Sequence, residues 1–456
     1  YSAFYIEDEF EYGDFSARVG LRLDYYNANQ PVMKDKYSLY ETLKKGQITS
    51  INGTPVTHPS NIGDDYVVYV DHSYSPTFVT GYRVEDTWYN ADGNKITDPE
   101  DLDAGSGVSP YLKYPGVRIG DDEWQPDMSF KSYGPVYSFL PQINLNYKFW
   151  RMNFYANYNS FSKNPYIAHI FRPEEYWEMW GGINNPALKP YRTDKINLGT
   201  NINVYKSIYA DISGQKTMLS DYFVIHGIVG AYPHYYYTVV NYYKTIDVNS
   251  ITATIMFVPK KPAGWSGNVS ATKSFMDEED RRLINSSDFV LNGNLNYDFG
   301  YGHNFMFPEN KTLTIVFEGF NIGLFYQQRS GTPFPLFKIP VNSGSPRTIS
   351  QDNGITPSFS FFNLRAEKGF YFKNSGLYLS AYVWVENLFD KRNLYFIYPN
   401  TGEPDEDGYL SDPKWQNEIE NQVNPESYRA IYQMRLKNPA HYAKPRIWRI
   451  GIIAKF

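Results

Sequence analysis

The stretch Gly376–Asn393 restricts the fold of this chain most, because its first half alternates strictly between two kinds of side chain. Alternation with a period of two predicts a β-strand whose two faces meet different surroundings. The aliphatic face carries Leu377, Leu379, Ala381, Val383 and Val385, and the other face carries Tyr378, Ser380, Tyr382, Trp384 and Glu386. Such a strand suits both a soluble sandwich with a wet polar face and a membrane barrel with its aliphatic face in lipid.

The same alternation recurs along the chain and predicts about thirteen strands. They are expected at Ser2–Tyr12, Phe15–Tyr26, Tyr137–Phe149, 152–158, Ile196–Tyr205, Ile208–Met218, Ile246–Val258, Trp265–Phe275, Phe289–Phe299, Thr312–Tyr326, Ser358–Phe372, the first half of Gly376–Asn393, and Arg446–Phe456. Tight turns alternate with loops of roughly ten to a hundred residues, an asymmetry typical of outer-membrane barrels. A propeller would show a repeat of about 40–45 residues, and none is present. We therefore predict an all-β fold, a transmembrane antiparallel barrel.

Two long connections interrupt the strands. Residues 27–135 are expected to form a large extracellular insert, with a short helix at Lys36–Lys45 ended by Gly46 and a hairpin tip at Trp88–Asn94. Residues 388–445 are expected to form the last long extracellular loop. Single-chain bacterial barrels have an even number of strands, so thirteen predict an open curved wall that needs partner strands.

The amino-acid composition limits which classes of protein and which kinds of site remain possible. The 456 residues carry a formal net charge of −6 and no cysteine, which removes disulfides, thiolate metal sites and cysteine nucleophiles. No run of 18 apolar residues exists, which excludes a transmembrane helix. Aromatic residues make up 18% of the chain, which suits interfacial girdles and a ligand-contacting lumen, and also a soluble sugar-binding β protein. The chain opens in mid-strand without an initiator methionine, so we interpret it as part of a longer polypeptide.

Four motifs in order give the chain a family resemblance. They are Tyr5–Asp8 with Gly20–Tyr26 (an aromatic-x-x-Asp strand, then GLRxDxY), Asn185–Pro190 with Asn197–Gly199 (NPxLKPE…ELG), Asn387–Asn393 (NLFDKxx), and Pro445–Phe456 (a closing strand with a terminal aromatic). Tyr191 stands where the second motif usually has Glu. The chain thus resembles the C-terminal half of the barrel of TonB-dependent outer-membrane receptors, especially the branch with a regulatory-like domain before the plug.

The resemblance implies a 22-stranded barrel with a plug in its lumen, of which this chain would supply the last thirteen strands. It further implies active import of a nutrient ligand across the outer membrane of a Gram-negative bacterium, powered by an inner-membrane TonB complex. The implied partners are outer-membrane lipid and the chain's own plug and N-terminal strands. No nucleic-acid partner is expected. The alternative is a non-enzymatic surface barrel that acts as a passive porin, an adhesin or a platform for a surface lipoprotein.

No enzymatic motif is present: G-x-S-x-G, P-loop, H-E-x-x-H and dinucleotide fingerprints are all absent, so we predict a non-enzyme. Aromatic loop residues are candidates for stacking on a ligand, although they could also pack the loops together or mark the interfacial belt. These are Trp88, Trp124, Trp177, Trp180, Tyr235, Tyr236 and Tyr237. The polar faces predict a set that faces the lumen and hydrogen-bonds the plug: Asn144, Asn146, Asn292, Asn294, Asn296, Asp298, Arg365 and Glu367.

One acidic loop is a metal candidate. Glu403, Asp405 and Asp407 stand at positions like 1, 3 and 5 of a calcium loop, with Gly408 at position 6. Position 12 would be Lys414 rather than a bidentate Glu, which departs from the pattern and leaves a solvated acidic turn as the competing interpretation. No other cofactor is predicted.

Overall fold

Thirteen antiparallel strands form one sheet, here called the wall. The computed structural model describes residues 1–166, 170–179, 181–258, 264–300, 311–337, 349–372 and 376–455. The wall consists of β1 (Ser2–Tyr12), β2 (Phe15–Tyr26), β12 (Val136–Phe149), β13 (Met152–Lys163), β15 (Tyr191–Tyr205), β16 (Ile208–Ser220), β19 (Ile246–Phe257), β20 (Gly264–Phe275), β21 (Phe289–Asp298), β22 (Phe320–Arg329), β25 (Phe359–Phe372), β26 (Leu377–Glu386) and β27 (Ile447–Lys455). None of the helices in the described part of the chain has the length and hydropathy that a transmembrane helix requires.

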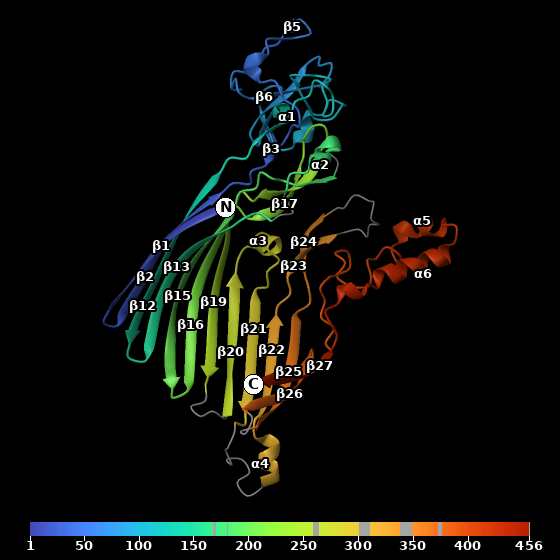
Figure 1. Cartoon of the computed structure of the whole chain (residues 1–456). Coiled ribbons are helices and arrows are strands. Elements are labelled where there is room, and N and C mark those ends of the chain that lie inside the picture. Colours follow the sequence, from blue (N-terminus) through green and yellow to red (C-terminus); the bar gives the residue numbers. More distant parts are fainter. Residues whose placement is uncertain are drawn as a thin grey trace.

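Each wall strand pairs with the wall strands before and after it in sequence, from β1 at one edge to β27 at the other. Figure 1 shows the strands side by side as a curved surface, with the longer connections at one end and most of the short turns at the other. The predicted all-β antiparallel fold and the count of thirteen strands are confirmed. The edge strands β1 and β27 do not pair with each other, so within the described residues the wall is open.

Strand register gives the wall two chemically different faces. Directly paired residues share a face, and one row runs Asn144, Asn157, Asn197, Gln215 and Ser250 across five neighbouring strands. The opposite face carries exposed aliphatic side chains, which include Leu198, Ile212, Ile251, Val269 and Ile450. At the end with the short turns, exposed aromatic rings accumulate at Tyr12, Trp150, Tyr205 and Trp265.

Residues 27–135, here called the insert, form a separate body above the wall (Figure 1). Its elements are β3 (Pro31–Met33), β4 (Ser50–Ile51), β5 (Thr54–Pro55), β6 (Val67–Val70), β7 (Val79–Val84), β8 (Thr87–Asn90), β9 (Lys95–Ile96), β10 (Ser109–Pro110), α1 (Pro126–Ser129) and β11 (Phe130–Ser132). A five-stranded sheet in the order β10-β6-β7-β8-β9 covers a core that includes Ile51, Ile62, Val68 and Tyr82. The insert therefore has a hydrophobic core of its own.

The other connections carry short elements. They are α2 (Pro173–Glu178), β14 (Gly181–Ile183), β17 (Phe223–Ile228), β18 (Tyr236–Asn241), α3 (Glu278–Leu283), α4 (Lys311–Phe317), β23 (Pro333–Phe337), β24 (Ile349–Ile355), α5 (Gln416–Glu420) and α6 (Pro425–Leu436). The strands β14, β18 and β17 form a small sheet that packs with the insert through Tyr236 and Leu39.

Two local predictions are wrong. The strand expected at Thr312–Tyr326 begins only at Phe320, because Lys311–Phe317 is the helix α4 at the end of the wall that otherwise has tight turns (Figure 1). The helix expected at Lys36–Lys45 is absent; the segment consists of a turn, bends and isolated bridges to distant residues, among them Thr42 with Leu112, and a short 3-10 helix begins only at Lys45. The predicted hairpin tip is confirmed, since the turn after Asn90 joins β8 to β9.

Candidate functional site

The polar face of the wall brings together the eight residues predicted to face a lumen. The residues are distributed over three strands: Asn144 and Asn146 on β12; Asn292, Asn294, Asn296 and Asp298 on β21; Arg365 and Glu367 on β25. The registers place all of them on one face, the face of the row that starts at Asn144. Whether they contact a plug stays a prediction.

Amide groups on this face bond to one another across strands. The Asn294 Nδ2 group donates to Asn268 Oδ1 at 2.6 Å, and the Gln327 Nε2 group donates to Asn292 Oδ1 at 2.9 Å. The Arg365 guanidinium donates to the Glu367 carboxylate at 2.7 Å. Each amide has more donors and acceptors than these bonds use, so the face can still bind polar groups that approach it.

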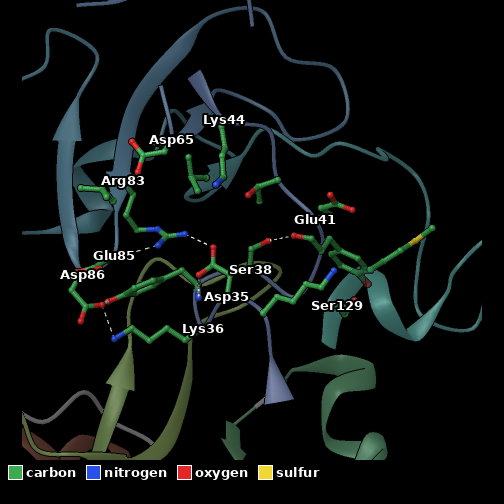
Figure 2. A pocket seen from close by; sticks show the side chains of 17 residues that line it. Asp35, Lys36, Ser38, Glu41, Lys44, Asp65, Arg83, Glu85, Asp86 and Ser129 are labelled. Carbon is green, nitrogen blue, oxygen red and sulfur yellow. Dashed lines mark hydrogen bonds and ion pairs between the residues drawn. The ribbon is translucent and has the colours of Figure 1, made fainter. Parts of the chain in front are cut away.

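A cavity with a volume of about 660 Å³ lies in the insert (Figure 2). Its walls come from the segment around Lys34–Lys44, the turn Val84–Asp86 and the end of α1. Lysines and carboxylates both line it, so the cavity offers no single sign of charge to a ligand.

Arg83 supports this cavity from the interior and is only 4% exposed. Its Nε donates to the Tyr69 hydroxyl at 3.0 Å. Its Nη1 donates to the Glu85 carbonyl at 2.9 Å, and its Nη2 donates to the Asp35 carboxylate (Figure 2). The guanidinium carbon also lies 4.7 Å from the centroid of the Tyr37 ring. Burial raises the pKa of Tyr69 to about 12, which keeps the phenol neutral as a partner for Arg83.

Asp86 holds the rim of the insert cavity. Lys36 Nζ lies 2.6 Å from its carboxylate, and the Tyr37 hydroxyl donates to it at 3.0 Å. Burial alone would raise the pKa of Asp86, but the bonds from Lys36 and Tyr37 outweigh burial and lower it. The carboxylate is therefore ionised at neutral pH.

The predicted aromatic candidates divide into covered and exposed rings. Trp88 and Tyr236 are 4% and 3% exposed, so protein side chains cover both rings. Trp124 packs against the core near Phe130 and donates from Nε1 to Ser129 Oγ at 3.2 Å. The exposed rings are Trp177, Tyr235 and Tyr237, at 66%, 60% and 53%. Trp180 lies outside the described residues.

Among these candidates the structure brings Tyr235 and Tyr237 together, with ring centroids 6.1 Å apart in an edge-to-face arrangement. Tyr236 points the other way and donates its hydroxyl to the Lys36 carbonyl at 2.8 Å. The alternation follows from the extended backbone, which turns successive side chains to opposite sides. Exposed aromatic candidates therefore remain at two places, Trp177 and the Tyr235–Tyr237 pair.

A second cavity, here called the entrance pocket, has a volume of about 410 Å³ and was not predicted from the sequence. It lies between the end of α3, the loop-side ends of β21, β22 and β25, and the segment Leu394–Ile397. Val290 pairs with Arg329, and Arg329 pairs with Phe359, so the floor of the pocket belongs to the polar face. The entrance pocket thus opens where the polar face meets the long loops.

In the acidic loop, Asp405 and Asp407 bond to groups of the protein itself. The Asp407 carboxylate accepts bonds from the Tyr432 hydroxyl at 2.6 Å and from the Tyr409 amide at 2.9 Å. The Asp405 carboxylate accepts a bond from the Tyr442 hydroxyl at 2.5 Å. Across the described residues, Glu403 included, no group of three or more His, Asp or Glu side chains is placed to hold a metal ion. These carboxylates instead fix the fold of the last loop.

Comparisons with known proteins give matches among solved structures only. No protein-family model and no curated protein matches the chain. The ferric citrate transporter FecA in its unliganded form is 11% identical over 99% of this chain and 44% of its own, with a TM-score of 0.44. The siderophore receptor PirA from Acinetobacter baumannii is 10% identical over 99% of this chain and 54% of its own, with a TM-score of 0.43.

The copper transporter OprC is 13% identical over 87% of this chain and 44% of its own, with a TM-score of 0.41. The chain spans about half the length of these structures. The resemblance to TonB-dependent outer-membrane receptors rests on the four sequence motifs and stays a prediction.

Proposed function

We propose that the chain is the C-terminal part of the barrel of a TonB-dependent transporter that imports a nutrient ligand across the outer membrane of a Gram-negative bacterium. One observation carries the proposal: strand register places polar side chains such as Asn144, Asn197 and Gln215 on one face of the wall, while exposed aliphatic side chains such as Leu198 and Ile212 lie on the other. In water, so large an exposed apolar face would drive aggregation, whereas in a bilayer it is the favourable surface.

The aromatic rings near the short turns support the same orientation. Tyr12, Trp150 and Tyr205 are exposed, as expected for residues at a membrane–water interface. The short turns would then face the periplasm, while the insert and the loop 388–445 would face the outside. The unpaired edges of β1 and β27 favour completion by further strands, since open backbone groups in lipid cost several kcal/mol each.

In the proposed transporter, ligand would bind among the long loops and the upper polar face. The exposed rings of Trp177, Tyr235 and Tyr237 are the aromatic contacts we propose for it. The amides of β12 and β21 would hydrogen-bond a plug that closes the lumen. Coupling to an inner-membrane TonB complex would remodel this plug and release the ligand inward.

The test is uptake in cells that carry the full-length protein, with and without the inner-membrane coupling protein. Labelled ferric chelates, oligosaccharides and peptides would be offered as a panel. We expect uptake of at least one class that disappears when the coupling protein is deleted. Uptake that persists at the same rate without it would overturn active import and favour the alternative, a passive porin.

A further inference from the structure

The entrance pocket has an unusual charge for its setting. Among the described residues that line it, Arg329 is the only one with a formal charge at neutral pH, and none is a carboxylate. Within the described part of the chain, Arg329 has no ion pair or hydrogen bond from its guanidinium. The nearby Asp288 carboxylate is engaged by Lys273 and by Ser330, which lower its pKa. The pocket therefore offers one uncompensated positive charge.

Stacking holds the Arg329 guanidinium in place. Its central carbon lies 4.4 Å from the centroid of the Phe359 ring, on the neighbouring strand. A planar guanidinium held by a ring keeps its N–H edge free, and that edge matches the two oxygens of a carboxylate. The arrangement thus provides a positioned donor pair for an anion with two oxygens.

An aromatic platform lies beside this cation. The Tyr395 ring stacks on Phe359 with centroids 5.8 Å apart and an interplanar angle of 22°. Tyr395 is nevertheless 64% exposed, so one face of its ring remains open to a ligand. A flat, weakly polar molecular face, such as the C–H face of a sugar ring, would pack on this surface.

Hydroxyl groups complete the lining: Ser286, Ser287, Ser330, Thr332 and Thr356. Ser287 Oγ donates to the Ser330 carbonyl at 2.7 Å, and Ser330 Oγ donates to the Asp288 carboxylate. Ser330 Oγ also accepts bonds from the Asp288 and Phe289 amides at 3.1 Å, so its bonding capacity is used. Ser287 Oγ has donated its proton, and its oxygen lone pairs can accept bonds from the hydroxyl groups of a ligand. A peptide would instead need a carboxylate for its ammonium group, and the lining has none.

We propose that the entrance pocket binds a uronic-acid residue of an acidic oligosaccharide, with Arg329 paired to the sugar carboxylate and Tyr395 packed on the sugar ring. The pocket volume of about 410 Å³ lies in the range of small-molecule sites. The inference rests on the proposed import function, because the pocket opens onto the polar face at the loop end of the wall. It names the substrate class that this face would receive.

Binding to the purified full-length protein in detergent would test the proposal, by calorimetry with trimers of galacturonate, glucuronate and mannuronate. Their methyl esters, which have the same rings without the negative charge, are the matched probes, and trialanine represents a peptide. We expect at least one acid to bind and its ester to bind at least tenfold more weakly. Equal affinity for acid and ester, binding of trialanine alone, or no binding of any of the three acids would overturn the proposal.

Variants separate the two contacts. R329Q should weaken binding of the acid at least tenfold and leave binding of the ester unchanged. Y395A should weaken binding of both the acid and the ester. R449Q removes a cation from the same face outside the pocket and should change neither. An R329Q protein that binds the acid as tightly as the unchanged protein contradicts the assignment.

This test is independent of the transport test. If the uronate trimers bind but no coupled uptake is found, the proposal for the entrance pocket stands and the proposed import function is wrong. Coupled uptake of another ligand class, with no binding of the acids, would retain import and remove the pocket.

Discussion

The Arg83 guanidinium donates from Nη2 to the Asp35 carboxylate, joining β7 to the turn that follows β3. Arg83 is almost fully buried, so loss of the carboxylate leaves an uncompensated interior charge. We expect D35N to destabilise the insert by about 2–3 kcal/mol, near the lower end for a broken buried pair because Asp35 is partly exposed. Hydrogen exchange of the insert in the full-length protein would measure the loss.

The matched control for D35N is D65N. Asp65 lines the same cavity but has no ion pair or hydrogen bond within the described residues. D65N should stay within about 0.5 kcal/mol of the unchanged protein, as expected for a surface substitution. Equal effects of D35N and D65N would show that the Arg83 pair does not hold the insert together.

Acid should loosen the rim of the insert cavity through Asp86. Its pKa is lowered in the folded protein, so its contribution to stability is present above the unfolded pKa, near 3.8, and is lost as the pH falls below that value. We expect faster hydrogen exchange around Lys36 and Asp86 as the pH falls below about 4, beyond the intrinsic pH dependence of exchange. D86N should remove this component, and a D86N profile identical to that of the unchanged protein would contradict the assignment.

The two faces of β15 predict opposite responses to a new charge. Leu198 is 57% exposed on the aliphatic face, and Asn197 is its neighbour on the polar face. We expect L198R to cost about 2–4 kcal/mol of stability in a bilayer and N197R to cost little. The amount of folded protein recovered from outer-membrane fractions would report the difference. Similar losses from both substitutions would argue against a lipid-facing and a water-facing side.

The Asn387 side chain connects the two ends of the loop 388–445 by hydrogen bonds. Its side chain bonds both the amide and the carbonyl of Lys391 at 3.0 Å and donates to the Lys444 carbonyl at 3.2 Å. Its φ of 52° is left-handed, a conformation that asparagine tolerates and alanine disfavours. We expect N387A to cost about 2–3 kcal/mol, measured as faster proteolysis of the loop.

The variant N387G keeps the left-handed conformation and loses only the side-chain bonds, so its cost should be smaller than that of N387A. Asn417 is an exposed asparagine of α5 in the same loop, and N417A should leave proteolysis unchanged. A loop cleaved equally fast in N387A and N417A would contradict the role of Asn387.

Calcium and its removal should leave the last loop unchanged. The Asp405 and Asp407 carboxylates already bond Tyr442 and Tyr432, so calcium would have to displace these hydroxyl groups. We expect no shift in loop proteolysis between millimolar calcium and a chelator. Protection by calcium that D407N abolishes would restore the calcium-loop interpretation.

Alternation predicted the wall because each strand carries chemically different side chains on its two faces along its length. Ser2–Tyr12 and Phe15–Tyr26 have the bounds expected from their sequence pattern. The segment Lys311–Phe317 misled the same reasoning, because Thr, Ile, Val and Phe are typical of strands and seven residues are too few to separate the two periods. In the insert, bridges from Thr42 and Lys44 to distant residues overrode a local helix-like pattern.

The candidate site was less predictable than the wall, because burial depends on contacts between distant segments. Nothing near Trp88 in sequence indicates that Leu102 and Tyr69 cover its ring. The entrance pocket forms only because strand register pairs Arg329 with Phe359 and because the last loop brings Tyr395 onto the Phe359 ring. The alternation of side chains in the sequence shows which face of a strand a residue lies on. It does not show which residues of that face come together to form a pocket.

The insert leaves and re-enters the wall at facing positions, since Tyr26 at the end of β2 pairs with Val136 at the start of β12. Its ends are therefore as close together as those of an ordinary hairpin, and the entropic cost of a connection rises only slowly with its length. Such a body can be exchanged for a turn of a few residues, or for an unrelated domain, without altering the strands beneath. The insert and the wall are thus free to diversify separately.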